Sequence, residues 1–259
     1  MAVATRRKAP AKPGAGMSLA EAMAALEQAG SEQTRKTWRR HGAPDPLFGV
    51  SFASLKALAK RIRMDHALAL ALWDTGNYDA RNLAVKVVDP AQATPELLDR
   101  WAAEPSARLA GSYVAWLAVE SGHGRALVDR WLAAADEPRR LAGWKLVGAL
   151  AQLDATLDPA WLRARLGELE RGIHAAANAE REAMNRTLIA IGCHDAAHRD
   201  AAIEAARRIG PVQVDHGDTA CKTPDAIDSI ARAWAHAGSK GFDSPAAQER
   251  GRESLRTRC

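Results

Sequence analysis

Cysteine and aromatic residues are scarce in this chain of 259 residues, and long apolar runs are missing. Its cysteines, Cys193, Cys221 and Cys259, are too few and too scattered for a disulfide framework, which favours a reducing, cytoplasmic compartment. No stretch approaches the ~18 uncharged apolar residues of a transmembrane helix, so no membrane partner is expected. The N-terminal residues 1–16 also lack the apolar centre of a secretory signal.

β-Branched runs are equally scarce, whereas alanine is abundant, and this balance argues against a β-sandwich or a β-barrel. Helix starts recur instead. Ser18 with Glu21 has the pattern of a capping box, and an N-cap residue precedes each of several amphipathic runs. The N-cap candidates are Ser31, Ser51, Asp65, Asn77, Thr94, Asp136 and Asp158.

The spacing of these starts gives paired helices about every 35–45 residues, as in helical repeat proteins. We therefore predict an all-α fold, a right-handed α-solenoid of HEAT-like helix pairs with about a dozen helices. A single irregular all-α domain is the alternative. The folded body is predicted to be residues 17–237, between a disordered basic tail at 1–16 and a polar flexible tail at 238–259. The basic tail is alternatively an arm that attracts a polyanion.

Four segments, in this order and spacing, carry a family resemblance over roughly residues 20–236. They are His41–Ile62, His66–Pro90, Trp131–Leu150 (WLAAADEPRRLAGWKLVGAL) and Met184–Gly192 (MNRTLIAIG), the last followed by Val214–Ala226. The arrangement resembles the DNA alkylation repair family, the AlkD-like HEAT-repeat alkylpurine DNA glycosylases. This resemblance implies a partner, duplex DNA that is possibly alkylated, bound on a basic concave face. It also implies no metal and no other cofactor. A DNA-binding protein of this kind is expected to associate with the nucleoid, and we expect a monomer.

The resemblance also assigns site residues. Arg139 and Arg140 match the basic pair of the family and are predicted to bind a backbone phosphate, with Lys145 extending the positive surface. Arg81 matches a basic family position, although an internal salt bridge is an equal alternative. Trp38, next to two arginines and a histidine, is the tryptophan most expected to face DNA.

The catalytic element departs from the family, whose active members carry an aromatic residue followed four residues later by aspartate. The matching segment, Pro105–Ser121, holds no carboxylate before Glu120. Trp116 and Glu120 have the right spacing but lie about one turn too late, and Asp79 is the next carboxylate to consider. We therefore predict that excision of N3- or N7-alkylpurines is weak or lost. Whether the protein is an active DNA N-glycosylase is therefore undecided from the sequence.

Two further hypotheses compete with a DNA-binding protein without excision. One is an active glycosylase that uses a non-standard carboxylate, and the other is a scaffold that binds a protein partner. A zinc site built from Cys193, His194, His198, His216 and Cys221 is not predicted, because their spacing matches no standard pattern. A nucleophilic pair of Cys221 and His216 lacks an orienting third group. The polar loop Asp215–Pro224 has no assigned role.

Overall fold

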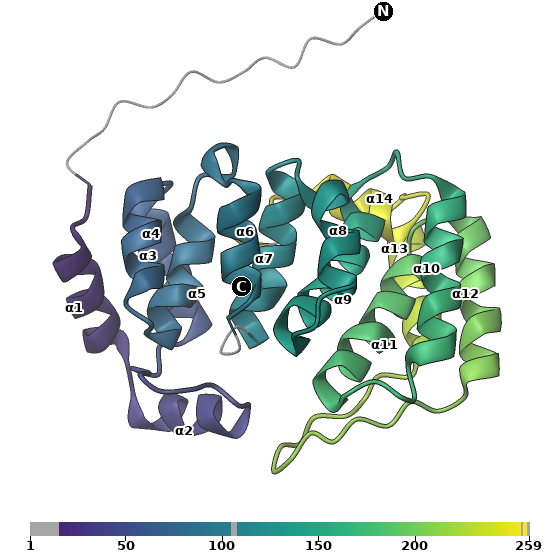
Figure 1. The fold of residues 1–259 in the computed structure, drawn as a ribbon, viewed down its shortest axis with the longest axis horizontal. Coiled ribbons are helices and arrows are strands. Elements are labelled where there is room, and N and C mark those ends of the chain that lie inside the picture. The colour runs from purple at the N-terminus through teal and green to yellow at the C-terminus, as the bar shows by residue number, and fades with distance from the viewer. Residues whose placement is uncertain (1–15, 105–107, 255, 258–259) are drawn as a thin grey trace, which may run out of the picture.

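The computed structural model describes residues 16–104, 108–254 and 256–257, so the predicted tail at 1–16 lies outside the described residues except for Gly16. The described chain is a succession of α-helices with one 3-10 helix, η1 (Figure 1). In order they are α1 (Leu19–Ala29), α2 (Glu32–Arg40), α3 (Phe52–Ile62), α4 (His66–Asp74), α5 (Tyr78–Val87), η1 (Pro90–Gln92), α6 (Pro95–Ala102), α7 (Arg108–Glu120), α8 (Gly124–Leu132), α9 (Glu137–Leu153), α10 (Pro159–Gly172), α11 (Asn178–Gly192), α12 (Ala196–Ile209), α13 (Ala226–Ser239) and α14 (Pro245–Arg250).

Helices α1 to α6, α9 and α10 begin at the predicted caps. Ser18 and Glu21 form the reciprocal capping box at the start of α1. A side-chain oxygen of the N-cap residue accepts a backbone N–H at the start of α2, α3, α4, α5, α6, α9 and α10. These are the orphan donors that every helix exposes at its first turn, so a local sequence signal was enough to locate the starts.

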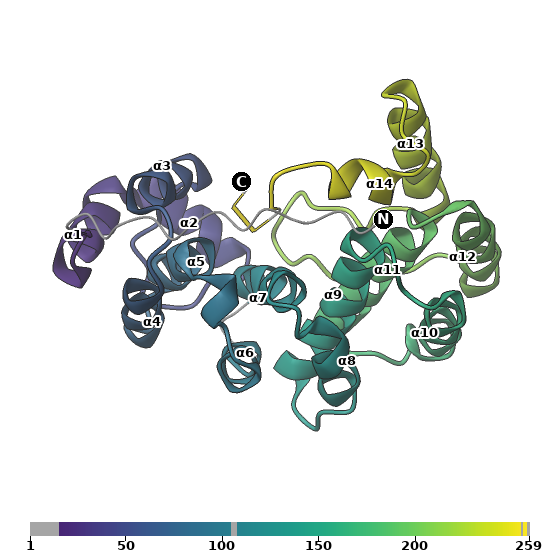
Figure 2. The same cartoon turned by 90° about the horizontal axis from the view of Figure 1, so that it is seen from above.

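Seen from above, the helices form two curved layers (Figure 2). Helices α3, α5, α7, α9 and α11 follow one another in one layer, and α4, α6, α8, α10 and α12 follow in the other. The helices of these two layers bury apolar side chains against their neighbours, and one continuous core results. Trp73 and Trp101 stack within this core with ring centroids 4.2 Å apart. The all-α solenoid of helix pairs is thereby confirmed.

The C-terminal residues differ from the flexible tail expected at 238–259. Helix α14 packs against α9, and the guanidinium of Arg256 is buried beneath the surface. Arg256 donates to Glu120 on α7 at 3.0 Å and to the carbonyl of Val85 on α5 at 2.6 Å. The Nζ of Lys86 donates in turn to the Arg256 carbonyl at 3.2 Å. Polar side chains thus anchor this segment, where the sequence suggested solvation.

Candidate functional site

A cleft of about 420 Å³ lies where α2, α3, α7, α9 and α11 approach the loop at residues 210–225. Aromatic rings line it at one end, from Trp38 on α2 and Phe52 on α3. Helix α7 contributes Ser112, and α9 contributes Leu141 and Lys145. Segments from both halves of the chain therefore share one concavity.

Cationic side chains dominate the charged lining of the cleft. Arg40, Lys145 and Arg186 line it, together with His41 and His216. The carboxylate among its described lining residues is Glu182, whose Oε1 accepts two hydrogen bonds from Arg186, at 3.1 and 3.3 Å. The lining therefore carries a net positive charge, which favours a polyanionic ligand.

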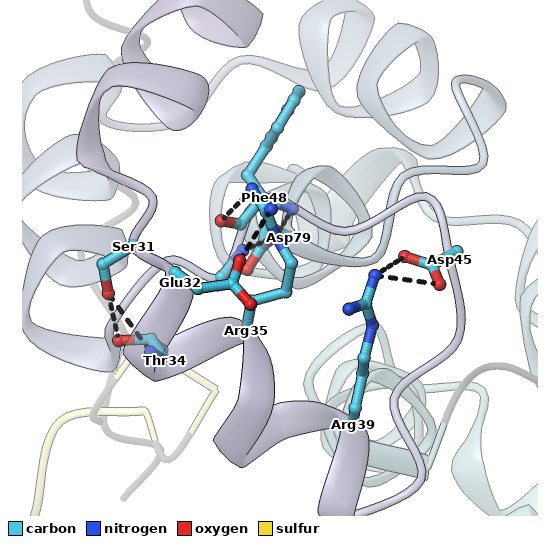
Figure 3. Close-up of polar contacts among 9 residues, drawn as sticks. Ser31, Glu32, Thr34, Arg35, Arg39, Asp45, Phe48 and Asp79 are labelled. Carbon is cyan, nitrogen blue, oxygen red and sulfur yellow. Dashed lines mark hydrogen bonds and ion pairs between the residues drawn. The ribbon is translucent and has the colours of Figure 1, made fainter.

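Asp79 on α5 holds the segment between α2 and α3, and Figure 3 shows its carboxylate beside Phe48 of that segment. Its carboxylate accepts the backbone N–H groups of Phe48 at 2.7 Å, Gly49 at 3.0 Å and Val50 at 3.0 Å. Burial raises the pKa of Asp79 above its usual value, although these three N–H groups and Arg35 oppose the rise. The segment between α2 and α3 is therefore tied to the solenoid through one buried side chain.

Trp38 is fixed by the segment that Asp79 holds. Its indole N–H donates to the carbonyl of Val50 at 3.0 Å, and its ring packs against Phe52 with centroids 4.8 Å apart. Gly49, with a φ of +79°, lies so close to α2 that a Cβ would come within 2.6 Å of the backbone nitrogen of Arg35. A glycine is required there, because a side chain would push α2 and its tryptophan away from the cleft.

The opposite wall of the cleft is the 210–225 loop, whose backbone bonds to α11. The Asn178 side chain donates to the Asp215 carbonyl at 2.7 Å and accepts the Asp215 N–H at 2.8 Å. Arg181 donates to the carbonyl of Gln213 at 3.0 Å. These contacts position His216, whose ring lies 3.1 Å from the Thr223 hydroxyl, at the cleft.

The carboxylates considered as catalytic groups form internal contacts. Asp79 is 1% exposed and bonds to backbone N–H groups, as described above. Glu120 accepts from Arg256 and is also within hydrogen-bonding distance of the Ser254 hydroxyl. Trp116 is half-buried, and neither it nor Glu120 lines the cleft. The structure therefore places Asp79, Trp116 and Glu120 outside the lining of the cleft.

The predicted DNA-binding residues divide into two groups. Lys145 and Trp38 line the cleft. Arg139 donates to Asp136 at 2.8 Å and to Asp99 at 3.2 Å, and Arg140 lies 3.4 Å from Glu180 while donating to two backbone carbonyls.

Arg81 shows the internal alternative considered for it. It pairs with Glu104 at 3.2 Å and lies over the ring of Trp73, with its side chain only 14% exposed.

Sequence reasoning missed part of the cleft lining. Arg186 and Glu182, one turn apart on α11, gave no signal, because a charged pair at this spacing usually marks a solvated helix face. The five residues weighed for zinc are divided between two places. His216 and Cys221 line the cleft, whereas Cys193, His194 and His198 do not. Burial raises the pKa of the Cys193 thiol to about 11.

Of the helices in the described part of the chain, none has the length and apolar character needed to cross a bilayer.

Comparisons with known proteins agree with this architecture. Two curated relatives match over 218 residues, or 80% of this chain and 93% of theirs. They are the uncharacterized proteins Lin0241 of Listeria innocua, 27% identical, and Lmo0209 of Listeria monocytogenes, 26% identical. A solved structure, described as "a new family of proteins related to the HEAT-like repeat DNA glycosylases with affinity for branched DNA structures", matches with a TM-score of 0.77. It is 28% identical, and the match covers 88% of this chain and 98% of that one. The sequence model of the DNA alkylation repair enzymes matches residues 22–230, and the chain therefore belongs to the DNA alkylation repair enzyme family.

Proposed function

We propose that this protein binds duplex DNA in the cationic cleft, that it prefers branched or distorted structures, and that it has little or no excision activity toward alkylated purines. The observation that carries this proposal is the composition of the cleft, where cations and aromatic rings meet while α7 supplies a hydroxyl, Ser112. The affinity for branched DNA described for the structural relative supports the choice of ligand.

The cations account for affinity. Beyond the Arg186–Glu182 ion pair, Arg40 and Lys145 add positive charge to the concavity, and contacts of such cations to phosphates release condensed counterions. Such contacts position a protein on DNA without reading its sequence. Binding is therefore expected to depend on the shape of the DNA and on the salt concentration, with little dependence on base sequence.

The aromatic end of the cleft accounts for a preference among DNA structures. A junction or a distorted duplex exposes unstacked bases, and a base stacked on an aromatic side chain contributes about 1–3 kcal/mol. Trp38 and Phe52 line the cleft, and the contacts with Val50 and Asp79 fix their place. A linear duplex keeps its bases stacked on one another, so it offers fewer exposed bases for Trp38 and Phe52 to stack against.

A second candidate function is excision through a non-standard carboxylate, and Glu182 is the observation that favours it. It lies in the cleft, with its side chain 16% exposed, and could place negative charge beside a sugar. Its hydrogen bonds with Arg186 neutralise that charge, so we rank excision second.

Binding to matched DNA substrates tests the proposal. A four-way junction and a linear duplex of the same sequence would be titrated at several salt concentrations, with wild type and an Arg40→Ala/Lys145→Ala variant. We expect tighter binding to the junction, and a loss of about 10–100-fold in affinity and of about two in the salt slope for the variant. The control is Arg163→Ala/Arg171→Ala, which removes the same charge from exposed positions on α10 outside the cleft. An equal loss in the control, or equal affinity for both substrates, contradicts the proposal.

A further inference from the structure

Two histidines and an aspartate meet at the turn between α11 and α12, away from the cleft. They are His194 in the turn, Asp195 at the N-cap of α12, and His198 in its first turn. One ligand atom from each lies within 4.8 Å of the others. The imidazoles of His194 and His198 are 8% and 1% exposed, whereas the Asp195 side chain is 46% exposed. The group is therefore buried on the histidine side and open to water on the carboxylate side.

Backbone carbonyls determine where the protons of the two rings lie. The Nδ1 of His194 is 2.6 Å from the carbonyl of Ala151 on α9, and the Nε2 of His198 is 3.3 Å from the carbonyl of Pro159 on α10. A carbonyl oxygen only accepts hydrogen bonds, so each of these nitrogens carries the proton. The lone pairs of the neutral rings are then on the other nitrogens, His194 Nε2 and His198 Nδ1.

Those two lone pairs face the same carboxylate. His198 Nδ1 is 2.8 Å from Asp195 Oδ1, and His194 Nε2 is 3.9 Å from Asp195 Oδ2. Three lone-pair donors converge, so a positive group between them is favourable. Two ligands bound about 2.0 Å from a tetrahedral zinc ion lie about 3.3 Å apart. The two separations from Asp195, 2.8 and 3.9 Å, lie on either side of that value, and all three ligand atoms are within 4.8 Å of one another.

We propose that His194 Nε2, His198 Nδ1 and Asp195 bind a single Zn²⁺ ion, with water as the fourth ligand on the exposed side. Two imidazoles and a carboxylate are a donor set that suits zinc. The carbonyls of Ala151 and Pro159 supply the outer hydrogen bonds that commonly orient zinc-bound histidines. All three ligands lie in the turn before α12 and in its first turn, and the outer hydrogen bonds connect the two histidines to α9 and α10, so an ion here would stabilise the junction of these helices.

This site differs from the zinc set weighed on sequence alone. Asp195 replaces the cysteines, because the neighbouring Cys193 is buried and is not part of the converging group. The sequence shows an aspartate between the histidines without indicating that it points at both. A protonated His198 paired with Asp195 explains the 2.8 Å contact without metal, and the experiment separates the two explanations.

The test is zinc binding by the full chain after removal of metal with a chelator. Titration calorimetry with ZnCl₂ should give one ion per chain, and the melting temperature should rise by about 5–10 °C at about 100 times the Kd. Asp195→Asn keeps a capping side chain and removes the charged ligand, so binding should weaken at least about tenfold. Asp200→Asn makes the same change at an exposed position of α12 and should leave zinc binding unchanged.

A second measurement does not depend on the variants. X-ray absorption at the zinc edge of the wild-type protein should show nitrogen and oxygen ligands at about 2.0 Å and no sulfur. Sulfur in the shell, binding that survives Asp195→Asn, or no zinc bound by the folded chain would overturn the proposal. In the last case the pair is explained by the protonated histidine alone.

Discussion

The carboxylate of Asp79 and the backbone nitrogen of Gly49 are 3.0 Å apart, although 30 residues separate them in the sequence. This hydrogen bond and its two neighbours, from the N–H groups of Phe48 and Val50, tie the segment before α3 to the solenoid. Figure 3 shows the Asp79 carboxylate beside Phe48. Because Trp38 bonds to the same segment at Val50, Asp79 indirectly sets the position of an aromatic ring in the cleft. A residue considered for catalysis therefore acts in the structure as a positioning residue.

Asp79→Asn is expected to destabilise the protein by about 2–3 kcal/mol, because the amide presents N–H donors to buried N–H groups that need acceptors. Urea unfolding followed by circular dichroism measures this loss. Asp45→Asn is the matched control, since its ion pair with Arg39 is exposed and should matter by less than about 0.5 kcal/mol. Equal stability of the two variants would show that the three hydrogen bonds contribute little.

Arg256→Ala is expected to cost about 2–4 kcal/mol of unfolding free energy, although Arg256 is only three residues from the last residue of the sequence. The change leaves Glu120 without its cation and the carbonyl of Val85 without its donor. Thermal unfolding would show the loss as a lower melting temperature. Arg252→Ala, at an exposed residue of the same segment, should change it little. A flexible C-terminal segment would give the same result for both variants.

The fold could be predicted from the sequence because its signals are local. A capping serine and the glutamate that completes the box are three residues apart, and each apolar stripe recurs within one helix. The role of Arg256 could not be predicted, because its partner Glu120 is 136 residues away and nothing in a polar C-terminal sequence indicates burial. Composition alone predicts a flexible tail at residues 238–259, because composition carries no information about distant partners.

The sequence predicts only part of the candidate site, because the partners of its charged residues are also far away in the sequence. Arg139 and Arg140 are a conspicuous basic pair, but their partners Asp99 and Glu180 each lie 40 residues away. The sequence predicts that Lys145 and Trp38 bind DNA, and both line the cleft, whereas it gives no signal for Arg186 on α11. Which cations face a shared concavity depends on how successive repeats stack, and a single sequence does not show that directly.

Arg139→Ala/Arg140→Ala should therefore reduce stability more than DNA affinity. Both guanidinium groups are about 30% exposed and bond to acidic or carbonyl groups of the protein. Removing them takes one donor from Asp99 and one from Glu180, which keep their bonds to the indole N–H groups of Trp131 and Trp144. We expect a loss of about 1–3 kcal/mol in unfolding free energy and less than about threefold in junction affinity measured well below the melting temperature. A loss of junction affinity as large as that of Arg40→Ala/Lys145→Ala would show that Arg139 and Arg140 contact the DNA after all.

The ion pair of Asp154 and Arg125 predicts a specific pH dependence. The hydrogen bond from Arg125 lowers the pKa of Asp154 from 3.8 to about 2, which stabilises the folded state wherever the carboxyl is ionised. This contribution is fully present above the unfolded pKa near 4 and is lost as the pH falls through about 2. Because Arg125 is half exposed, we expect on the order of 1 kcal/mol.

Asp154→Asn tests this dependence by urea unfolding across the pH range. The stability difference from wild type should be constant from pH 7 to about 4 and should shrink below it. The control is Asp158→Asn, which changes the N-cap aspartate of α10; among the described contacts no arginine pairs with it. The stability difference between Asp158→Asn and wild type should not shrink in the same way as the pH falls toward 2. A difference between Asp154→Asn and wild type that grows on acidification contradicts the assignment.

The last prediction is that base excision will be absent or very weak. Hydrolysis at an alkylated purine builds positive charge on the sugar, and a well-placed carboxylate contributes several kcal/mol, with each 1.36 kcal/mol worth about tenfold in rate. Helix α7 brings Ser112 to the cleft, its sequence offers no carboxylate before Glu120, and Glu120 is bonded to Arg256. Release of 7-methylguanine and 3-methyladenine from methylated DNA should therefore stay at the uncatalysed rate. A gel shift on the same DNA, run in parallel, ensures that the protein is bound.

If bases are released, Glu182→Gln and Glu120→Gln identify the carboxylate responsible. Loss with Glu182→Gln alone would establish the second candidate function, with the cleft glutamate as its carboxylate. Loss with Glu120→Gln alone would mean that the C-terminal segment leaves α7 when DNA binds, because Arg256 occupies that carboxylate in the free protein.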